Sequence, residues 1–163
     1  MSGKKSKKEA KADGIKVVCE NRRARFDYHL GERFEAGLVL TGSEVKSLRL
    51  GKVNLSDAYA DVRDGKAFLV QASIEPYEKG GYANHEPKRK RKLLLHHQEI
   101  QKLTDRVQTK GETLIPTRLY FKNSRAKVEL ALGTGKKSHD KRQAIRERET
   151  SRELDRSMRR FKQ

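Results

Sequence analysis

Apolar and polar residues alternate most regularly between Phe34 and Leu40, and this stretch is the best candidate for the centre of the core. Every second residue from Phe34 onward is apolar, so these side chains would face one side of a strand. Val39 would be partly buried on the other side. We therefore expect a strand whose inner face contributes to the core.

A short helix is predicted directly after this strand. The hydroxyl of Ser43 can cap its first turn, and Glu44 suits the positive N-terminal end. Gly51 stands where a left-handed residue often ends a helix. Val45 and Leu48 lie three residues apart on one face, so the helix can close the end of the sheet to which the strand belongs.

Ahead of that strand, the pattern predicts a first strand and then a helix with a basic exterior. Ile15, Val17 and Cys19 recur at every second position. Asn21 is well suited to cap a helix over the segment NRRARFDYHL, which ends at Gly31. Its outer sides carry the arginines Arg22, Arg23 and Arg25. Such a group is either an ordinary solvated face or a contact for phosphates.

Two later strands are predicted to form a hairpin across Asp64-Gly65. Residues 57–62 and 66–74 flank this dipeptide, which accepts the two positive φ angles that a type I′ turn requires. Tyr59 and residues 68–70 would supply side chains to the core. A two-residue hairpin is therefore expected here.

A second hairpin is predicted near the end of the apolar part of the chain. Residues 113–122 and 125–132 alternate in polarity on either side of Asn123-Ser124. Pro116 cannot donate a ladder hydrogen bond, so it implies a sheet edge or a bulge. We expect both strands to lie in the same antiparallel sheet.

Between the two hairpins lie a long loop and a helix. Residues 75–92 contain prolines, glycines and a run of five cations, KRKRK, which repel one another unless an anion sits among them. Residues 93–107 then show helical spacing, with His96 on the apolar stripe and Gly111 as the stop. The adjacent His96 and His97 project about 100° apart on a helix, so we expect no metal site there.

The predicted elements together indicate a mainly β fold. Six short antiparallel strands, with two or three flanking helices, are typical of a small OB-like six-stranded barrel. A sandwich of the same strands is the alternative.

Composition divides the chain into three parts. Charged residues make up 37% of the 163 residues, against about 25% in typical domains, so the whole chain cannot be packed. We expect a disordered basic N-terminus over 1–14, a barrel over 15–133, and a basic tail over 134–163. The tail carries eleven Lys or Arg against five acids and no alternating apolar pattern. It is expected to be disordered when free and helical against a negative partner.

The net charge of +17 points to a polyanionic partner, with nucleic acid first. A membrane surface is disfavoured because there is no Trp and no long apolar segment. No apolar region follows the N-terminal lysines, so we expect no signal peptide. The single Cys19 fits a reducing cytosol, and hence a cytoplasmic protein.

An enzyme is also disfavoured. The acids are scattered within basic segments, and the five histidines have no triad-like setting. Gly133, Gly135 and Lys136 lack the spacing of a phosphate-binding loop. The sequence thus indicates no catalytic residue and no cofactor, and favours RNA over DNA because a barrel reads RNA through its sheet and loops.

Five segments resemble the SsrA-binding protein family in their order and spacing: ENRRARFDY, FEAGLVLTGSEVKSLR, KLLLHHQEI, YFKNSRAKVELALG and GKKSHDKR. The resemblance covers essentially all of 15–145, whereas 146–163 resembles the family in charge only. Ser124 departs from the glycine expected in the second hairpin turn. In that family an OB-like barrel binds the tRNA-like part of transfer-messenger RNA, around its elbow and D-loop. The resemblance therefore implies a role in trans-translation, which rescues stalled ribosomes.

The resemblance also implies two sets of contact residues. Those for transfer-messenger RNA are Asn21, Arg22, Arg25, Glu35, Lys46, Arg49, Arg91, Lys92, Lys122 and Asn123. Those of the tail, which by resemblance enters the small-subunit decoding region and the empty messenger path, are Gly135, Lys136, Lys137, His139, Asp140, Lys141 and Arg142. Glu35 would accept hydrogen bonds from a base edge or hold an arginine, or else form a simple salt bridge to Arg33 or Arg22.

One alternative function stays open at this stage. A structural ribosomal protein, or a general RNA-binding protein, also needs a basic body and basic tails. The RNA that copurifies with the protein would separate these cases. In either case we expect the free protein to be a monomer.

Overall fold

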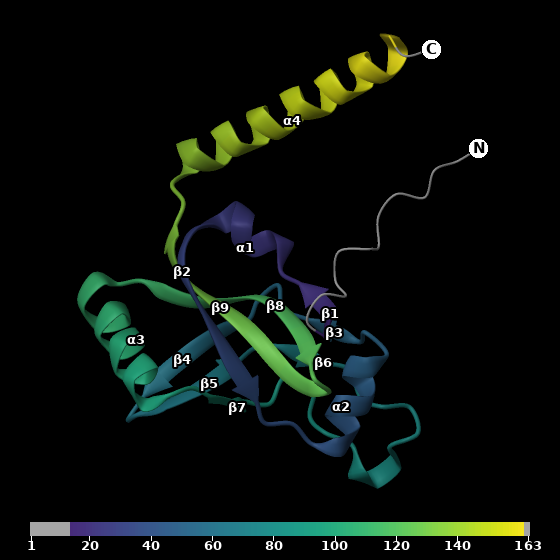
Figure 1. Cartoon of the computed structure of the whole chain (residues 1–163), viewed down its shortest axis with the longest axis vertical. Coiled ribbons are helices and arrows are strands. Elements are labelled where there is room, and N and C mark those ends of the chain that lie inside the picture. The colour runs from purple at the N-terminus through teal and green to yellow at the C-terminus, as the bar shows by residue number, and fades with distance from the viewer. Residues whose placement is uncertain (1–13, 162–163) are drawn as a thin grey trace.

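The computed structural model describes residues 14–161, and its centre is a closed ring of six antiparallel strands (Figure 1). In ring order the strands are β8 (Thr113–Lys122), β4 (Tyr59–Arg63), β5 (Lys66–Val70), β7 (Arg91–Leu94), β2 (Tyr28–Leu38) and β9 (Arg125–Gly135), and β9 pairs with β8 again. The predicted OB-like barrel is therefore confirmed, and the sandwich is excluded. The expectation for residues 1–13 lies outside the described residues.

Strand β8 closes the ring. One of its edges pairs with β9, and the other edge is shared between β4 and β1 (Ile15–Glu20). Leu114 pairs with Ala60 of β4, whereas Arg118–Lys122 pair with β1, which lies outside the ring. The register of β8 against β9 shifts between Pro116 and Arg118. The predicted bulge at Pro116 thus lies where β8 changes neighbours.

Side chains from alternate positions of the strands fill the barrel. Phe34, Ala36 and Leu38 of β2 are buried, as predicted. The expectations for two other residues are wrong, since Val39 is 44% exposed and Tyr59 is 42% exposed. Tyr59 is the first residue of β4, and Val39 lies one residue beyond the end of β2.

The helix α2 (Gly42–Arg49) follows β2 and begins two residues earlier than predicted. Thr41, not Ser43, is the N-cap residue, and its main-chain amide donates to Glu44 at 2.8 Å. Ser43 lies inside the helix and its hydroxyl contacts His85 Nδ1 at 2.8 Å. Leu48 is buried, and Gly51 has the expected positive φ of 74°.

Three predicted element boundaries are also corrected. The first helix, α1 (Arg22–Asp27), is shorter than expected because β2 already begins at Tyr28. The strand predicted over 66–74 breaks at Gln71, whose φ is 62°, and Ser73–Ile74 form β6 against β3 (Val53–Asn54) instead. Residues 91–94 form β7, although 91–92 were expected in the loop and 93–94 at the start of a helix.

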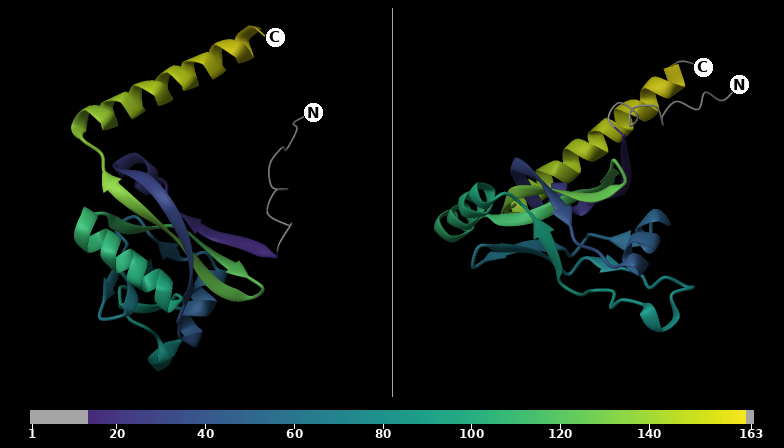
Figure 2. Two further views of the ribbon diagram at one scale, coloured as in Figure 1. Left: turned by 60° about the vertical axis from the view of Figure 1, so that its left-hand side comes forward. Right: turned by 60° about the horizontal axis from the view of Figure 1, so that its bottom comes forward.

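The helix α3 (His97–Lys110) packs on β4 and β8 and ends at Gly111, as expected. Ile100 and Leu103 are its buried residues. The loop after β6 contains one short helical turn, η1 (Gly81–Ala83). The last helix, α4 (Ser138–Phe161), extends away from the barrel in every view of the ribbon and has no buried residue (Figure 2).

Candidate nucleic-acid interface

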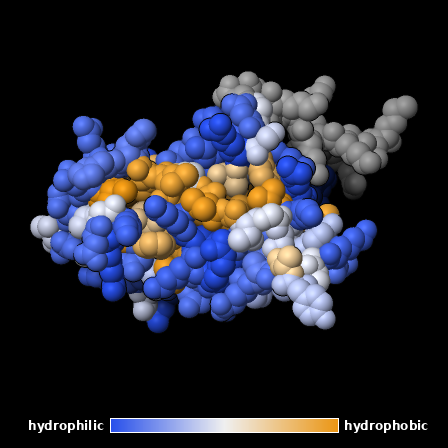
Figure 3. Space-filling view, turned by 90° about the horizontal axis from the view of Figure 1, so that it is seen from below, coloured by the Kyte–Doolittle hydropathy of each residue, from blue (hydrophilic) through white to orange (hydrophobic). Residues whose placement is uncertain are grey.

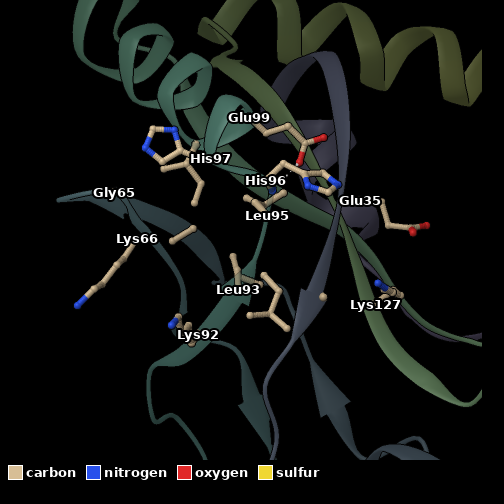
Figure 4. Close-up of a pocket in the computed structure, with 14 residues that line it drawn as sticks. Glu35, Gly65, Lys66, Lys92, Leu93, Leu95, His96, His97, Glu99 and Lys127 are labelled. Atoms are coloured by element: carbon tan, nitrogen blue, oxygen red, sulfur yellow. Dashed lines mark hydrogen bonds between the residues drawn. The ribbon is translucent and has the colours of Figure 1, made fainter.

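A groove of about 840 Å³ runs along the outer wall of the barrel (Figure 4). It lies between β7, β2 and β9 on one side and the turn before β5 and the start of α3 on the other. Lys92, Lys66 and Lys127 supply cations to it, and Glu35 supplies a carboxylate. Leu94 adds an apolar surface that is 55% exposed. We refer to these five residues as the wall groove.

A second hollow continues this surface past β9. It shares Glu35 and Lys127 with the wall groove and adds Lys122, Asn123 and Arg125 from the end of the β8–β9 hairpin. The structure thus brings together four of the residues predicted to contact RNA: Glu35, Lys92, Lys122 and Asn123. Their order along the wall follows from the closed ring, because alternate residues of each strand point outward.

Glu35 lines both hollows, whereas the other acid of the first hollow, Glu99, does not line the second. Tyr120 donates its hydroxyl hydrogen bond to Glu35 Oε2, and Lys122 Nζ lies 3.4 Å from the same oxygen. The hydrogen bond from Tyr120 and the charge of Lys122 lower the pKa of Glu35, although partial burial opposes them. Its side chain is 39% exposed, so the ionised carboxylate can still accept hydrogen bonds from a ligand.

The predicted salt bridge of Glu35 to Arg33 or Arg22 is wrong, since the ion-pair partner of Glu35 is Lys122. Arg33 pairs with Glu129 at 2.8 Å, and Glu129 is also held by Arg118 and by the hydroxyl of Thr117. Glu129 stands directly opposite Glu35 in the β2–β9 ladder. The two neighbouring acids therefore differ, since Glu129 is surrounded by partners within the protein and Glu35 remains accessible.

Asn21 has a structural role that differs from the expected RNA contact. Its side chain is buried, and its oxygen accepts from the amide of Ala24, which caps α1 as predicted. Its nitrogen donates to the carbonyls of Leu55 and Pro116, both at 3.0 Å. All of these groups are inside the protein, so the side chain cannot meet RNA in this structure.

Arg91 is also corrected from an RNA contact to a buried structural residue. Its side chain is 0% exposed and donates to Glu44 at 2.8 Å and to the carbonyls of Ala72 and Pro87. Arg89 holds the same carboxylate with two bonds of 2.7 Å. We call Glu44, Arg89 and Arg91 the Glu44 network.

The Glu44 network supplies the anion that the run of five cations requires. Burial alone would raise the pKa of Glu44, but the hydrogen bonds from Arg89 and the Thr41 amide, with the charge of Arg91, lower it to about 2. The sequence indicated that an anion had to lie among these cations. It did not show that the anion comes from α2, some 45 residues earlier.

The other four predicted RNA contacts lie at the two ends of β2. Arg22 and Arg25 are exposed on α1, which precedes β2, and Lys46 and Arg49 are exposed on α2, which follows it. Lys46 Nζ lies 5.3 Å from the centre of the Tyr77 ring. The structure therefore does not join these four cations to the wall groove in a single patch.

The tail residues also divide into two groups. Gly135 ends β9, and Lys136, Asp140 and Lys141 contact the body of the protein. Lys137, His139 and Arg142 are exposed, with 74% of the His139 side chain accessible. The expectation that residues 134–163 become helical only when bound stays a prediction.

Three residues of the wall groove were missed from the sequence: Lys66, Leu94 and Lys127. Lys127 alternates with the buried Val128 of β9, which was a usable signal. The spacing from Leu93 onward predicts a helix, so the outward direction of Leu94 in a strand does not follow from it. Figure 3 shows that apolar side chains also gather in a band between hydrophilic ones on the face seen from below.

Across residues 14–161, no group of three or more His, Cys, Asp or Glu is placed to hold a metal ion. No helix among those residues is long and apolar enough to cross a membrane.

Comparison with known proteins gives consistent matches. The family model described as "SmpB protein" matches residues 18–160. An SsrA-binding protein of Thermobifida fusca is 51% identical over 156 residues, which cover 96% of this chain and 98% of that relative. An SsrA-binding protein of Thermosynechococcus vestitus is 54% identical over 147 residues, covering 90% and 97%.

Solved structures match as well, and one of them is particularly informative. It is described as "tmRNA-SmpB: a journey to the center of the bacterial ribosome" and is 50% identical, with a TM-score of 0.65. The match covers 78% of this chain and 94% of that chain. The sequence matches therefore span 90% or more of this chain, and the fold match spans 78% of it.

Proposed function

This chain belongs to the SmpB family, and from that premise we propose that it binds transfer-messenger RNA and delivers it to stalled ribosomes. The observation that carries the proposal is the wall groove, in which cations from β5, β7 and β9 lie beside the accessible carboxylate of Glu35. The high identity to SsrA-binding proteins and the likeness to a tmRNA–SmpB structure support it.

The groove supplies the two kinds of contact that a folded RNA needs. Lys66, Lys92 and Lys127 can neutralise phosphates, which releases counterions without reading sequence. Glu35 can accept hydrogen bonds from an amino or imino group of a splayed base. Leu94 offers an apolar surface against which a base or sugar can pack. Together they fit a structured RNA with unpaired loops.

The tail supplies the ribosome contact in this proposal. Lys137 and Arg142 are exposed and can neutralise ribosomal phosphates, and the exposed ring of His139 can stack on a base. A tail that enters an empty messenger path is excluded when messenger RNA is present. The protein would thereby distinguish stalled ribosomes from translating ones.

The protein's role is binding and positioning, and we propose no covalent step. It belongs to a family of RNA-binding proteins. We place its action in the cytoplasm, where ribosomes translate.

Truncation after Gly135 tests the division between body and tail. This end keeps the whole of β9, including its pairing with Tyr28. We expect the truncated protein to bind transfer-messenger RNA with unchanged affinity in a gel-shift titration. Tagging of stalled products in a reconstituted translation system should be lost.

Two outcomes would contradict the proposal. Equal loss of RNA binding and tagging would show that the tail and the body do not have separate roles. Preference of the full-length chain for ribosomal RNA over transfer-messenger RNA would favour a structural ribosomal protein instead.

A further inference from the structure

The five consecutive cations of residues 88–92 are sorted into two directions. Arg91 is buried and Arg89 is partly buried, whereas Lys88, Lys90 and Lys92 are exposed. Arginines that face the body therefore alternate with lysines that face solvent, and this alternation begins before β7 does, in the last part of the long loop. We call Lys88, Lys90 and Lys92 the lysine row.

Glu44 accounts for this sorting. Its two carboxylate oxygens accept from Nε and Nη2 of Arg89 at 2.7 Å each, and one of them also accepts from Nε of Arg91 at 2.8 Å. A guanidinium can bind a carboxylate through two parallel hydrogen bonds, which an ammonium group cannot do. The buried anion thus holds the two arginines and leaves the three ammonium groups outside.

The Glu44 network also fixes where the lysine row lies relative to the wall groove. Glu44 belongs to the first turn of α2, which closely follows β2, the strand that carries Glu35. Arg91 donates to the carbonyls of Ala72 and Pro87 at 2.8 and 2.9 Å. These bonds hold the last part of the long loop against the connection between β5 and β6. The row is therefore attached to the barrel at several points.

The lysine row extends from the wall groove to a separate hollow. Lys92 lines the wall groove (Figure 4), and Lys88 lines a hollow of about 510 Å³. Lys90 stands between them in the chain and is exposed. Asp57 and Glu75 also line that hollow, so we place phosphate contacts on the lysines and not in the hollow itself. An RNA strand that leaves the wall groove along the row would meet successive cations.

The ammonium groups of the lysine row have no acidic partner among residues 14–161, whose ion pairs all involve other cations. Lys52, which lines the same hollow as Lys88, differs because it pairs with Glu78 at 2.8 Å. Neighbouring like charges repel one another, and a phosphate beside them relieves this repulsion while counterions are released. The row is therefore suited to a polyanion.

We propose that the lysine row binds the phosphate backbone of transfer-messenger RNA where the RNA leaves the wall groove, and that Glu44 is the positioning residue of this row. The side chain of Glu44 is 0% exposed, so it acts only through Arg89 and Arg91. These arginines hold the chain so that the lysines face outward. This inference rests on the proposed function and adds Lys88 and Lys90 to its RNA contact.

Removal of these two lysines tests the row itself. The variant Lys88→Ala with Lys90→Ala should bind transfer-messenger RNA roughly tenfold more weakly, and the slope of log affinity against log salt should fall by about 1.5. Lys79→Ala with Lys110→Ala is the matched control, because it removes the same charge from exposed positions outside the row. Thermal melting checks that both variants are folded. Equal affinities and slopes for the two variants would overturn the proposal.

A photo-reactive probe identifies the RNA that the row meets. The probe is attached to Lys90→Cys in a protein that also carries Cys19→Ser, so that the introduced thiol is the only one. With transfer-messenger RNA and stalled ribosomes present, the probe should crosslink to transfer-messenger RNA. Crosslinks to ribosomal RNA alone, or to no RNA, would contradict the inference.

A double-mutant cycle tests the positioning role of Glu44. Glu44→Gln should weaken RNA binding about fivefold in the parent protein, but less than about twofold when all three lysines of the row are alanine. A general loss of structure would weaken binding equally in both backgrounds and would refute this role. Arg89→Gln is a milder second variant, since its side chain is 31% exposed and its loss leaves Arg91 paired with Glu44. It should show coupling of the same sign.

The parent protein separates failure of this inference from failure of the proposed function. If the parent protein does not bind transfer-messenger RNA, the proposed function is refuted. If the parent protein binds this RNA and the variant without Lys88 and Lys90 binds it equally well, only the lysine row is refuted.

Discussion

Glu35 shows how a single acid can matter on a surface that is otherwise cationic. Tyr120 and Lys122 both approach its Oε2, and the side chain remains 39% exposed. A carboxylate there weakens nonspecific attraction to phosphate, but it can accept hydrogen bonds that only a base edge or a hydroxyl donates. The residue therefore favours particular RNA groups at some loss of general affinity.

Replacing Glu35 by Gln tests this role. The amide oxygen can still accept from Tyr120, so we expect the melting temperature to change by less than about 2 °C. Affinity for transfer-messenger RNA should fall by roughly tenfold, because the charged acceptor is lost. Binding is measured by gel shift and stability by thermal melting. Tyr120→Phe is the control for the internal hydrogen bond, and a large fall in melting temperature of Glu35→Gln would assign Glu35 to structure.

The turn between β8 and β9 holds a strained serine. Ser124 has a φ of 63° and follows Asn123 at 50°, whereas the equivalent position of the β4–β5 turn is Gly65 at 70°. Only glycine takes such angles without a Cβ penalty. We expect Ser124→Gly to increase the free energy of unfolding by about 1 kcal/mol.

Urea unfolding measures this change, and the reverse substitution provides the control. Gly65→Ser should lower the free energy of unfolding by a similar amount. A destabilising effect of Ser124→Gly would mean that the serine hydroxyl has a compensating contact in solution.

At the scale of elements, the long loop between β6 and β7 is ordered by polar contacts. The Glu44 network ties its end to α2, and His85 bridges Ser43 and the carbonyl of Ile74. Asn84 closes an inner turn with two bonds to the main chain of Tyr77. These contacts replace the apolar pattern that the loop lacks.

The stability contributed by Glu44 should depend on pH. Its pKa of about 2 in the folded state lies below its unfolded value, so its contribution is complete above about pH 5 and is lost as the pH falls toward 2. This loss amounts to roughly 3 kcal/mol. Glu44→Gln should be less stable at neutral pH, because two arginines lose their anion.

Urea unfolding of both proteins between pH 7 and pH 3 checks this prediction. The difference between the parent protein and Glu44→Gln should shrink as the pH falls. A difference that stays constant over this range would show that Glu44 does not titrate in the unfolding equilibrium.

Local sequence patterns predict correctly the elements that depend on neighbouring residues. They fail where contacts between residues far apart in the chain decide the structure. Both hairpin turns and the bulge at Pro116 follow from residues within a few positions. Arg91 looked like a surface cation because nothing near it in the chain reveals Glu44. Leu93 fits a helix and a strand equally well by spacing, and pairing with β2 decides between them.

At the scale of the whole molecule, the charge is divided between several surfaces. The wall groove, α1, α2 and the tail each carry cations, and α1 and α2 lie at opposite ends of β2. Figures 1 and 2 show the tail leaving the barrel on the side of α1. A large RNA and the ribosome can thus be held at the same time by different parts of the protein.

Salt dependence distinguishes phosphate contacts in the groove from general attraction. The double variant Lys92→Ala and Lys127→Ala should weaken binding of transfer-messenger RNA and reduce the slope of log affinity against log salt by about 1.5. Lys110→Ala, an exposed cation at the end of α3, is the control and should change the slope little. Equal slopes for the parent protein and the double variant would remove these lysines from the interface.

The closure of the ring through Leu114 and Ala60 makes this seam its shortest pairing, and α3 covers both strands there. Closure of the barrel at this seam therefore depends on α3, whose buried Leu103 packs in the core. In amide exchange, the protons around this seam should be released together with those of α3, ahead of the long β2–β9 ladder. The first opening of the body would therefore begin on its α3 side, and the continuous strand that joins α1 to α2 would be the last part to separate.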